Sequence, residues 1–146
     1  MKRILLLLGV LAVAAAAATG SAMARSTAAS SVAVKSSRFG RILFDGRGFV
    51  LYGFTKDTRA HSSCYGACAA SWPPYIVKSK PGAGAGATRS LLGTTRRADG
   101  RLQATYAGRP LYYYVGDRSP GQILCQNVAE FGGTWLVVRP TGTLAR

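Results

Sequence analysis

A histidine and two cysteines lie close together in this chain of 146 residues. His61, Cys64 and Cys68 follow one another with the spacing His-x-x-Cys-x-x-x-Cys. Imidazole and thiolate groups are ligands that copper and zinc accept, so these side chains form a candidate metal or redox site. Two cysteines four residues apart can also form a disulfide within a helical turn. The third cysteine is Cys125, much further along the chain.

The first 24 residues indicate the compartment in which these cysteines act. Met1-Lys2-Arg3 precedes an apolar run from Ile4 to Ala18, and Ala22-Met23-Ala24 ends the segment. This order of basic, apolar and small residues is typical of a secretory signal peptide. We therefore predict cleavage after Ala24 and a secreted or extracytoplasmic mature chain.

Export favours one pairing of the cysteines. Because thiols oxidise outside the cytoplasm, we predict a Cys64–Cys68 disulfide and a free thiol at Cys125. A bridge from Cys125 to Cys64 or Cys68 is the first alternative. The second is a copper or zinc site made by His61, Cys64 and Cys68, in an extracytoplasmic metal-binding or redox protein.

Other catalytic arrangements are missing from the sequence. It has one histidine, no Gly-x-Ser-x-Gly turn that would present a nucleophile, and no Gly-x-x-x-x-Gly-Lys loop that would hold a phosphate. We therefore predict no enzymatic activity and no cofactor, and favour a binding or interaction module.

Basic residues greatly outnumber acidic ones. The chain has 19 Lys and Arg against 5 Asp and Glu, a formal net charge of +14. A charge of this size attracts polyanions. Because the chain is exported, we expect anionic envelope polymers or lipid head groups as partners, with a protein partner also possible, and no nucleic acid.

A six-residue pattern occurs twice, at a constant offset of 60 residues. Its form is Tyr-x-aromatic-x-x-Asp, and the residues are Tyr52, Phe54 and Asp57, then Tyr112, Tyr114 and Asp117. Residues two apart on a strand share a face, so each aromatic pair lies on one side of a sheet. Each aspartate follows its strand, where it can accept hydrogen bonds from turn N–H groups. The alternative is that both carboxylates converge as an acid–base dyad.

The elements that must position these residues are short strands and turns. The duplication predicts a small two-repeat antiparallel all-β domain, with at most a short helical turn near residues 64–71 that Trp72-Pro73-Pro74 ends. The expected organisation is a signal peptide at 1–24, a flexible tether at 25–38, repeat one at 39–78, a linker at 79–95, repeat two at 96–140 and a tail at 141–146.

Four motifs together resemble those of a known family. They are the two Tyr-x-aromatic-x-x-Asp copies, the segment from Cys64 to Pro74 that contains Trp72, the strand from Gly108 to Tyr114, and Gly132-Gly133-Thr134-Trp135. This set resembles the bacterial secreted repeat proteins, often called lipoproteins with a conserved Yx(F/W/Y)xxD motif. The resemblance implies an extracytoplasmic protein whose family has no known function. Because no cysteine precedes Cys64, we expect no lipid anchor.

Overall fold

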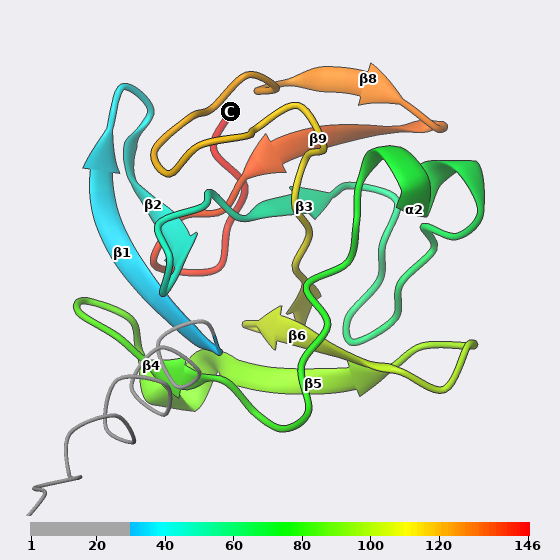
Figure 1. Ribbon diagram of the computed structural model, residues 1–146, viewed down its shortest axis with the longest axis horizontal. Helices are drawn as coiled ribbons and strands as arrows, with labels where there is room; N and C mark the ends of the chain where they lie inside the picture. The colour runs from blue at the N-terminus through cyan, green and yellow to red at the C-terminus, as the bar shows by residue number, and fades with distance from the viewer. Residues whose placement is uncertain (1–29) are drawn as a thin grey trace, which may run out of the picture.

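The computed structural model describes residues 30–146, so the predicted signal peptide and the first part of the predicted tether lie outside the described residues. The elements, in chain order, are β1 (Ser31–Ser37), β2 (Gly40–Asp45), β3 (Tyr52–Phe54), α2 (Ala67–Ser71), β4 (Gly82–Ala83), the 3-10 turn η1 (Arg89–Leu91), β5 (Leu92–Arg96), β6 (Leu102–Tyr106), β7 (Arg109–Pro110), β8 (Val128–Glu130) and β9 (Gly133–Val137). They form three small three-stranded sheets, with orders β2-β1-β4, β3-β9-β8 and β5-β6-β7 (Figure 1). The predicted all-β class is confirmed, and α2 is the short helical turn expected before Trp72.

The predicted flexible tether is wrong from Ser31 onward. Strand β1 pairs antiparallel with β2 from Ser37↔Gly40 to Val32↔Asp45, and Val32 and Val34 are buried. Two valines among small polar residues are a weak strand signal when the segment is considered alone. They become buried because residues of both repeats, among them Leu43, Tyr75 and Leu92, provide the apolar surface that the segment itself lacks.

The predicted linker and tail are also more ordered than expected. Within 79–95, β4 pairs in parallel with β1, and β5 already begins at Leu92. A Cβ at Gly84 would lie 3.0 Å from the Ala33 side chain, so glycine lets this segment approach β1 closely. In the 141–146 tail, Ala145 is buried and its N–H donates to the Val137 carbonyl.

The two repeats are related by a pseudo-twofold axis that passes between Tyr52 and Tyr112. The backbone N–H of each tyrosine donates to the carbonyl of the other, at 2.9 Å in both directions. Each repeat also supplies a strand to the other. Strand β3 pairs with β9 of the second repeat, and the strand of Tyr112 pairs with the segment around Pro74 of the first. Neither repeat can therefore complete its sheet alone.

Aromatic rings fill the core along this axis. Trp72 and Trp135, one from each repeat, stack with ring centroids 4.1 Å apart. Tyr52 meets Trp72 edge-on at 5.2 Å, and Tyr112 meets Trp135 in the same way at 5.1 Å. Phe54 also stacks on Trp135, with ring centroids 4.1 Å apart. Edge-to-face and offset contacts of this kind are the preferred aromatic geometries, so the core joins the repeats through their tryptophans.

Candidate functional site

The two copies of the motif are joined by crossed hydrogen bonds. The Tyr52 hydroxyl donates to Oδ2 of Asp117, and the Tyr112 hydroxyl donates to Oδ2 of Asp57, each at 2.7 Å. Each tyrosine therefore binds the aspartate of the other repeat. We call these contacts the crossed Tyr–Asp pairs. Hydrogen bonds to an ionised carboxylate are stronger than those between neutral groups, so the crossed pairs hold the repeats together.

The second oxygen of each motif carboxylate fixes a loop. Oδ1 of Asp57 accepts the Ser63 N–H and hydroxyl, both at 2.8 Å, and Oδ1 of Asp117 accepts the Leu124 N–H at 2.9 Å. The two backbone N–H bonds, from Ser63 and Leu124, are of the kind expected from the sequence. Among the described residues no hydrogen bond joins the two carboxyl groups, so their geometry gives no support to the acid–base dyad.

The pKa shifts of the four groups in the crossed pairs fit hydrogen bonds with a structural role. Burial raises the pKa of the Asp57 and Asp117 carboxyl groups, while the hydrogen bonds they accept act in the opposite direction. Burial also raises the pKa of the Tyr52 and Tyr112 phenols, and the nearby carboxylates raise it further. Both phenols stay protonated at neutral pH and act as permanent donors.

A third tyrosine–aspartate contact was not foreseen from the sequence. Asp45, which is fully buried, accepts the N–H groups of Arg47 and Phe49 at 2.9 Å and the Tyr113 hydroxyl at 3.0 Å. The Arg47 guanidinium pairs with the same carboxylate at 2.9 Å. The Asp45-Gly46-Arg47-Gly48 sequence indicated a turn, but only the fold brings Tyr113 to it.

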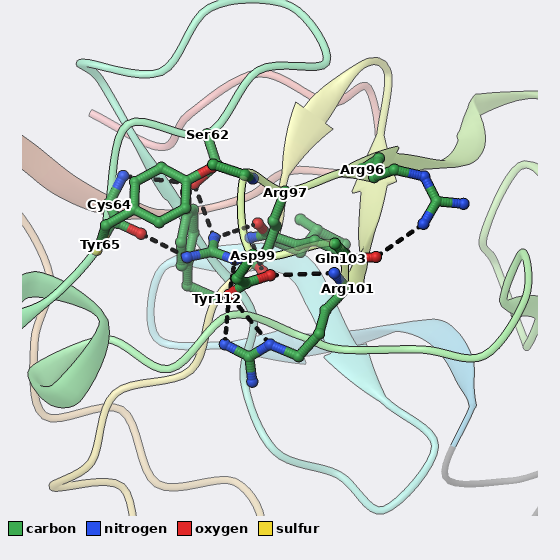
Figure 2. A network of polar contacts seen from close by, with 12 residues as sticks. Ser62, Cys64, Tyr65, Arg96, Arg97, Asp99, Arg101, Gln103 and Tyr112 are labelled. Carbon is green, nitrogen blue, oxygen red and sulfur yellow. Dashed lines mark hydrogen bonds and ion pairs between the residues drawn. The ribbon is translucent and has the colours of Figure 1, made fainter.

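A buried arginine organises a polar network that sequence reasoning also missed. Arg97 is 3% exposed, and its guanidinium donates to the Ser62 hydroxyl at 2.8 Å, Oε1 of Gln103 at 2.7 Å and the Cys64 carbonyl at 2.7 Å. The Tyr65 ring covers it, with the guanidinium carbon 4.3 Å from the ring centroid (Figure 2). We call this group the Arg97 cluster. A buried cation with this many acceptors is a fixed structural element.

The Arg97 cluster continues into one of the crossed pairs. The Ser62 hydroxyl lies 2.7 Å from the Tyr112 hydroxyl, which in turn donates to Asp57. The remaining guanidinium nitrogen, Nε of Arg97, lies 3.5 Å from Oδ2 of Asp99. The same carboxylate oxygen pairs with Arg101 at 2.7 Å. The Arg96-Arg97 dipeptide gives no signal that distinguishes the buried arginine from its exposed neighbour.

The three cysteines form one disulfide and leave one free thiol, as predicted. Cys64 and Cys68 form a disulfide with their Cα atoms 5.3 Å apart, and Cys125 is a free, partly buried thiol. His61 is exposed on the loop that precedes the bridge. Disulfide sulfurs carry no thiolate charge, so the donor set His61, Cys64 and Cys68 does not fit a copper or zinc ion while the bridge is present. Residues 30–146 contain no group of three or more His, Cys, Asp or Glu side chains that could hold a metal.

An open hollow lies between the β1–β2 hairpin and the loop at 118–124. Figure 1 shows this loop as the gold segment beside the hairpin. The open groove has a volume of about 630 Å³, and we call it the β1–β2 groove. It is lined by Lys35, Ser36, Ser37, Arg38, Phe44, Gly48, Pro120, Gly121, Gln122, Ile123 and Leu124. Two of these residues are basic and none is acidic.

The surface of the described residues is strongly positive. The exposed acidic residues are Asp99 and Glu130, because the other three acids are buried or partly buried. The exposed basic residues are Lys35, Arg38, Arg41, Arg47, Lys56, Arg59, Lys78, Lys80, Arg89, Arg96, Arg101, Arg118, Arg139 and Arg146. They are spread over both repeats, so the charge forms a general coat with no single centre.

Comparison with known proteins agrees with this two-repeat arrangement. A family model described as a secreted repeat of unknown function matches residues 33–75 and again residues 93–139. No curated protein and no solved structure matches the chain. Within residues 30–146, none of the helices has the length and apolar character needed to cross a membrane. The two family matches together cover more than half of the sequence, and the chain therefore belongs to this family of secreted repeats of unknown function.

Proposed function

We propose that the protein is an exported, non-catalytic binding module that associates with anionic polymers or lipid head groups of the cell envelope. The observation that carries this proposal is the unequal use of the two signs of charge. Each acidic residue has a partner within the protein and three of the five are buried or partly buried, whereas most basic residues are exposed to solvent. The proposal includes removal of the signal peptide after Ala24, which the mass of the secreted protein would test.

Each of the five acidic residues has a partner within the protein. Asp45, Asp57 and Asp117 accept hydrogen bonds from tyrosines, as described above. Glu130 accepts the indole N–H of Trp72 at 2.8 Å. Asp99 pairs with Arg101, and this hydrogen bond lowers the pKa of Asp99 to about 2. The carboxylates thus serve the fold and leave the basic coat largely unneutralised.

Few of the basic residues are neutralised by these acids. Among residues 30–146, ion pairs join Arg47 to Asp45 and both Arg97 and Arg101 to Asp99. The remaining exposed cations are available to external anions. Such a surface raises the local concentration of polyanions and accelerates their association, at low ionic strength above all. Binding of this kind is screened over about 10 Å at 0.1 M salt and depends little on the sequence or pattern of the polymer.

Sedimentation with lipid vesicles tests the proposal. The mature protein is mixed with vesicles of phosphatidylglycerol and phosphatidylcholine, or of phosphatidylcholine alone, while salt rises from about 0.05 M to about 0.5 M. We expect sedimentation with the anionic vesicles at low salt and release at high salt. Equal binding to both vesicles, or binding that salt leaves unchanged, would contradict an electrostatic association.

A soluble polyanion extends the test to envelope polymers. Polyphosphate or a polyglutamate chain competes with the vesicles if the basic coat is the binding surface, because both ligands meet the same charges. A neutral polymer such as dextran is the matched control and leaves the sedimented fraction unchanged. Competition by dextran to the same extent would refute the charge-based mechanism.

A further inference from the structure

The two repeats differ at one place that the pseudo-twofold axis makes equivalent. On one side of the axis the Gly121 N–H donates to the Gly48 carbonyl at 2.8 Å, and on the other the Ala60 N–H donates to the Gly108 carbonyl at 2.6 Å. The loop at 118–124 therefore takes the same position against the β1–β2 hairpin as the loop at 58–63 takes against the β5–β6 hairpin. The first of these junctions holds the β1–β2 groove, and the second holds the Arg97 cluster.

The strand registers identify the equivalent residues. Lys35 pairs with Ile42 in the β1–β2 hairpin, and Thr95 pairs with Gln103 in the β5–β6 hairpin. The offset is 61 along the second strands, because the Leu51 N–H donates to the Leu43 carbonyl and the Leu111 N–H donates to the Ala104 carbonyl. The registers then give an offset of 60 along the first strands, and the second turn is one residue longer. Three equivalent pairs then have different chemistry, and they are Ser37 and Arg97, Ile42 and Gln103, and Ile123 and Ser62.

These differences explain why one junction is closed and the other is open. In the second repeat the Arg97 guanidinium fills the junction and bonds to Gln103 and Ser62. Thr95 also closes it with a hydrogen bond to the Ala60 carbonyl. In the first repeat a serine replaces the arginine and two isoleucines replace the polar partners. The space is therefore unfilled, and the side chains below it are apolar.

The chemistry of the β1–β2 groove is that of an amphiphilic anion site. Lys35 and Arg38 are exposed among the lining residues. The Lys35 ammonium lies 5.7 Å from the centre of the Phe44 ring. The Arg38 guanidinium donates to the Ile123 carbonyl at 2.7 Å. Phe44 and Ile123 are buried, whereas Leu124 is 57% exposed. Cations at the rim and apolar groups inside complement a ligand with a charged head and an apolar tail.

We propose that the β1–β2 groove binds a single-chain anionic lipid. Its head group lies beside Lys35 and Arg38, and its acyl chain covers Phe44, Ile123 and Leu124. The volume of about 630 Å³ falls within the range of small-molecule sites, about 300–1,000 Å³. This inference rests on the proposed function, because it names the class of envelope ligand that one part of the positive surface selects.

Calorimetric titration of the mature protein with 1-palmitoyl lysophosphatidylglycerol, kept below its micelle concentration, tests the inference. The zwitterionic lysophosphatidylcholine is the control ligand, and we expect it to bind about tenfold more weakly because it carries no net charge for the two cations. The Lys35→Glu variant should lose about tenfold in affinity for the anionic lipid. Its charge-matched control, Lys78→Glu, replaces an exposed lysine outside the groove and should change the affinity less than about twofold.

A second variant separates groove binding from charge. Ser37→Arg places in the groove the side chain that fills the equivalent junction, and it adds a positive charge. We expect this variant to lose binding of the single-chain lipid but to sediment with anionic vesicles at least as well as the unmodified protein. Ser79→Arg, at an exposed position outside the groove, adds the same charge and should keep both activities.

The outcomes distinguish this inference from the proposed function. Loss of lipid binding in Ser37→Arg but not in Ser79→Arg supports the groove. Equal effects of Lys35→Glu and Lys78→Glu, or no saturable binding of the single-chain lipid, overturn the groove inference even if salt-sensitive vesicle binding persists. Saturable lipid binding without any vesicle binding would instead overturn the general electrostatic association.

Discussion

The crossed Tyr–Asp pairs lead to a prediction that distinguishes this structure from one in which each motif copy forms its own tyrosine–aspartate bond. Within one copy, Tyr52 is five residues from Asp57, so a hydrogen bond within one motif is the alternative arrangement that must be distinguished. In the structure Tyr52 instead bonds Asp117, which is 65 residues away. A double-mutant cycle should therefore show energetic coupling between Tyr52 and Asp117, and little between Tyr52 and Asp57.

The size of the effect follows from burial and from the charge of the acceptor. Tyr52 is fully buried, and its hydroxyl donates to the carboxylate of Asp117 at 2.7 Å. A hydrogen bond to a charged group contributes about 1.5–3 kcal/mol, so Tyr52→Phe should lower the free energy of unfolding by about 2 kcal/mol. Tyr112→Phe should cost more, about 3 kcal/mol, because the Tyr112 hydroxyl also contacts Ser62.

Urea unfolding followed by tryptophan fluorescence measures these changes, since Trp72 and Trp135 are buried in the core. With an m-value of about 2 kcal/mol/M, a loss of about 2 kcal/mol moves the unfolding midpoint by about 1 M. The coupling of Tyr52→Phe with Asp117→Asn should be about 1–2 kcal/mol, whereas its coupling with Asp57→Asn should be below about 0.5 kcal/mol. The control is Tyr65→Phe, which removes a hydroxyl bonded to an exposed backbone N–H and should cost less than about 0.5 kcal/mol.

Two results would refute this reasoning. One is stronger coupling of Tyr52 to Asp57 than to Asp117, because it would mean that each motif closes on itself. The other is a cost of Tyr52→Phe no greater than that of Tyr65→Phe, because the hydroxyl would then contribute nothing through the carboxylate. A change in m-value alone would indicate an altered denatured state and would call for the cycle to be repeated by thermal unfolding.

Three further predictions concern the rest of the site. Arg97→Met should lower the free energy of unfolding by about 3 kcal/mol, measured by urea unfolding, because it leaves three buried acceptors without their donor. Burial raises the pKa of Asp57 and Asp117, so their contribution to stability is greatest below their unfolded pKa and is lost as pH rises through the folded pKa. When the pH falls from about 7 to about 4, the free energy of unfolding of an Asp57→Asn/Asp117→Asn variant should therefore rise less, or fall more, than that of the unmodified protein. Reducing the Cys64–Cys68 bridge should cost only about 2 kcal/mol in thermal unfolding, since the closed loop is short.

Much of the fold could be predicted because its signals are local. The prolines after Trp72 ended the short helix, the alternation of Tyr52 and Phe54 indicated a strand, and export favoured the Cys64–Cys68 bridge. Each of these features depends on residues that are neighbours in sequence. The constant offset between the motifs then indicated that the second copy would behave like the first.

What the sequence did not predict depends on contacts between the repeats. The segment of β1 resembles a tether in sequence because Val32 and Val34 have no large apolar neighbours in the chain and become buried only in the core shared by the repeats. The partner of Tyr52 could not be inferred, because the motif spacing is the same whether the pairs cross or not. The burial of Arg97 could not be predicted either, because it depends on Ser62 and Gln103, which are 41 residues apart in sequence and both bond to Arg97 in the fold.

The duplication itself suggests where specific function is located. Positions that are the same in both copies, such as the motif tyrosines, the motif aspartates and the two tryptophans, hold the repeats to one another. A structural role of this kind requires both copies to keep the same residues, because the tyrosine of each copy bonds the aspartate of the other. A ligand site carries no such requirement, and its residues are free to differ between copies. The contrast between Ser37 and Arg97 is a difference of this type, and it places the open groove on the side where the chain does not fill the junction with its own arginine.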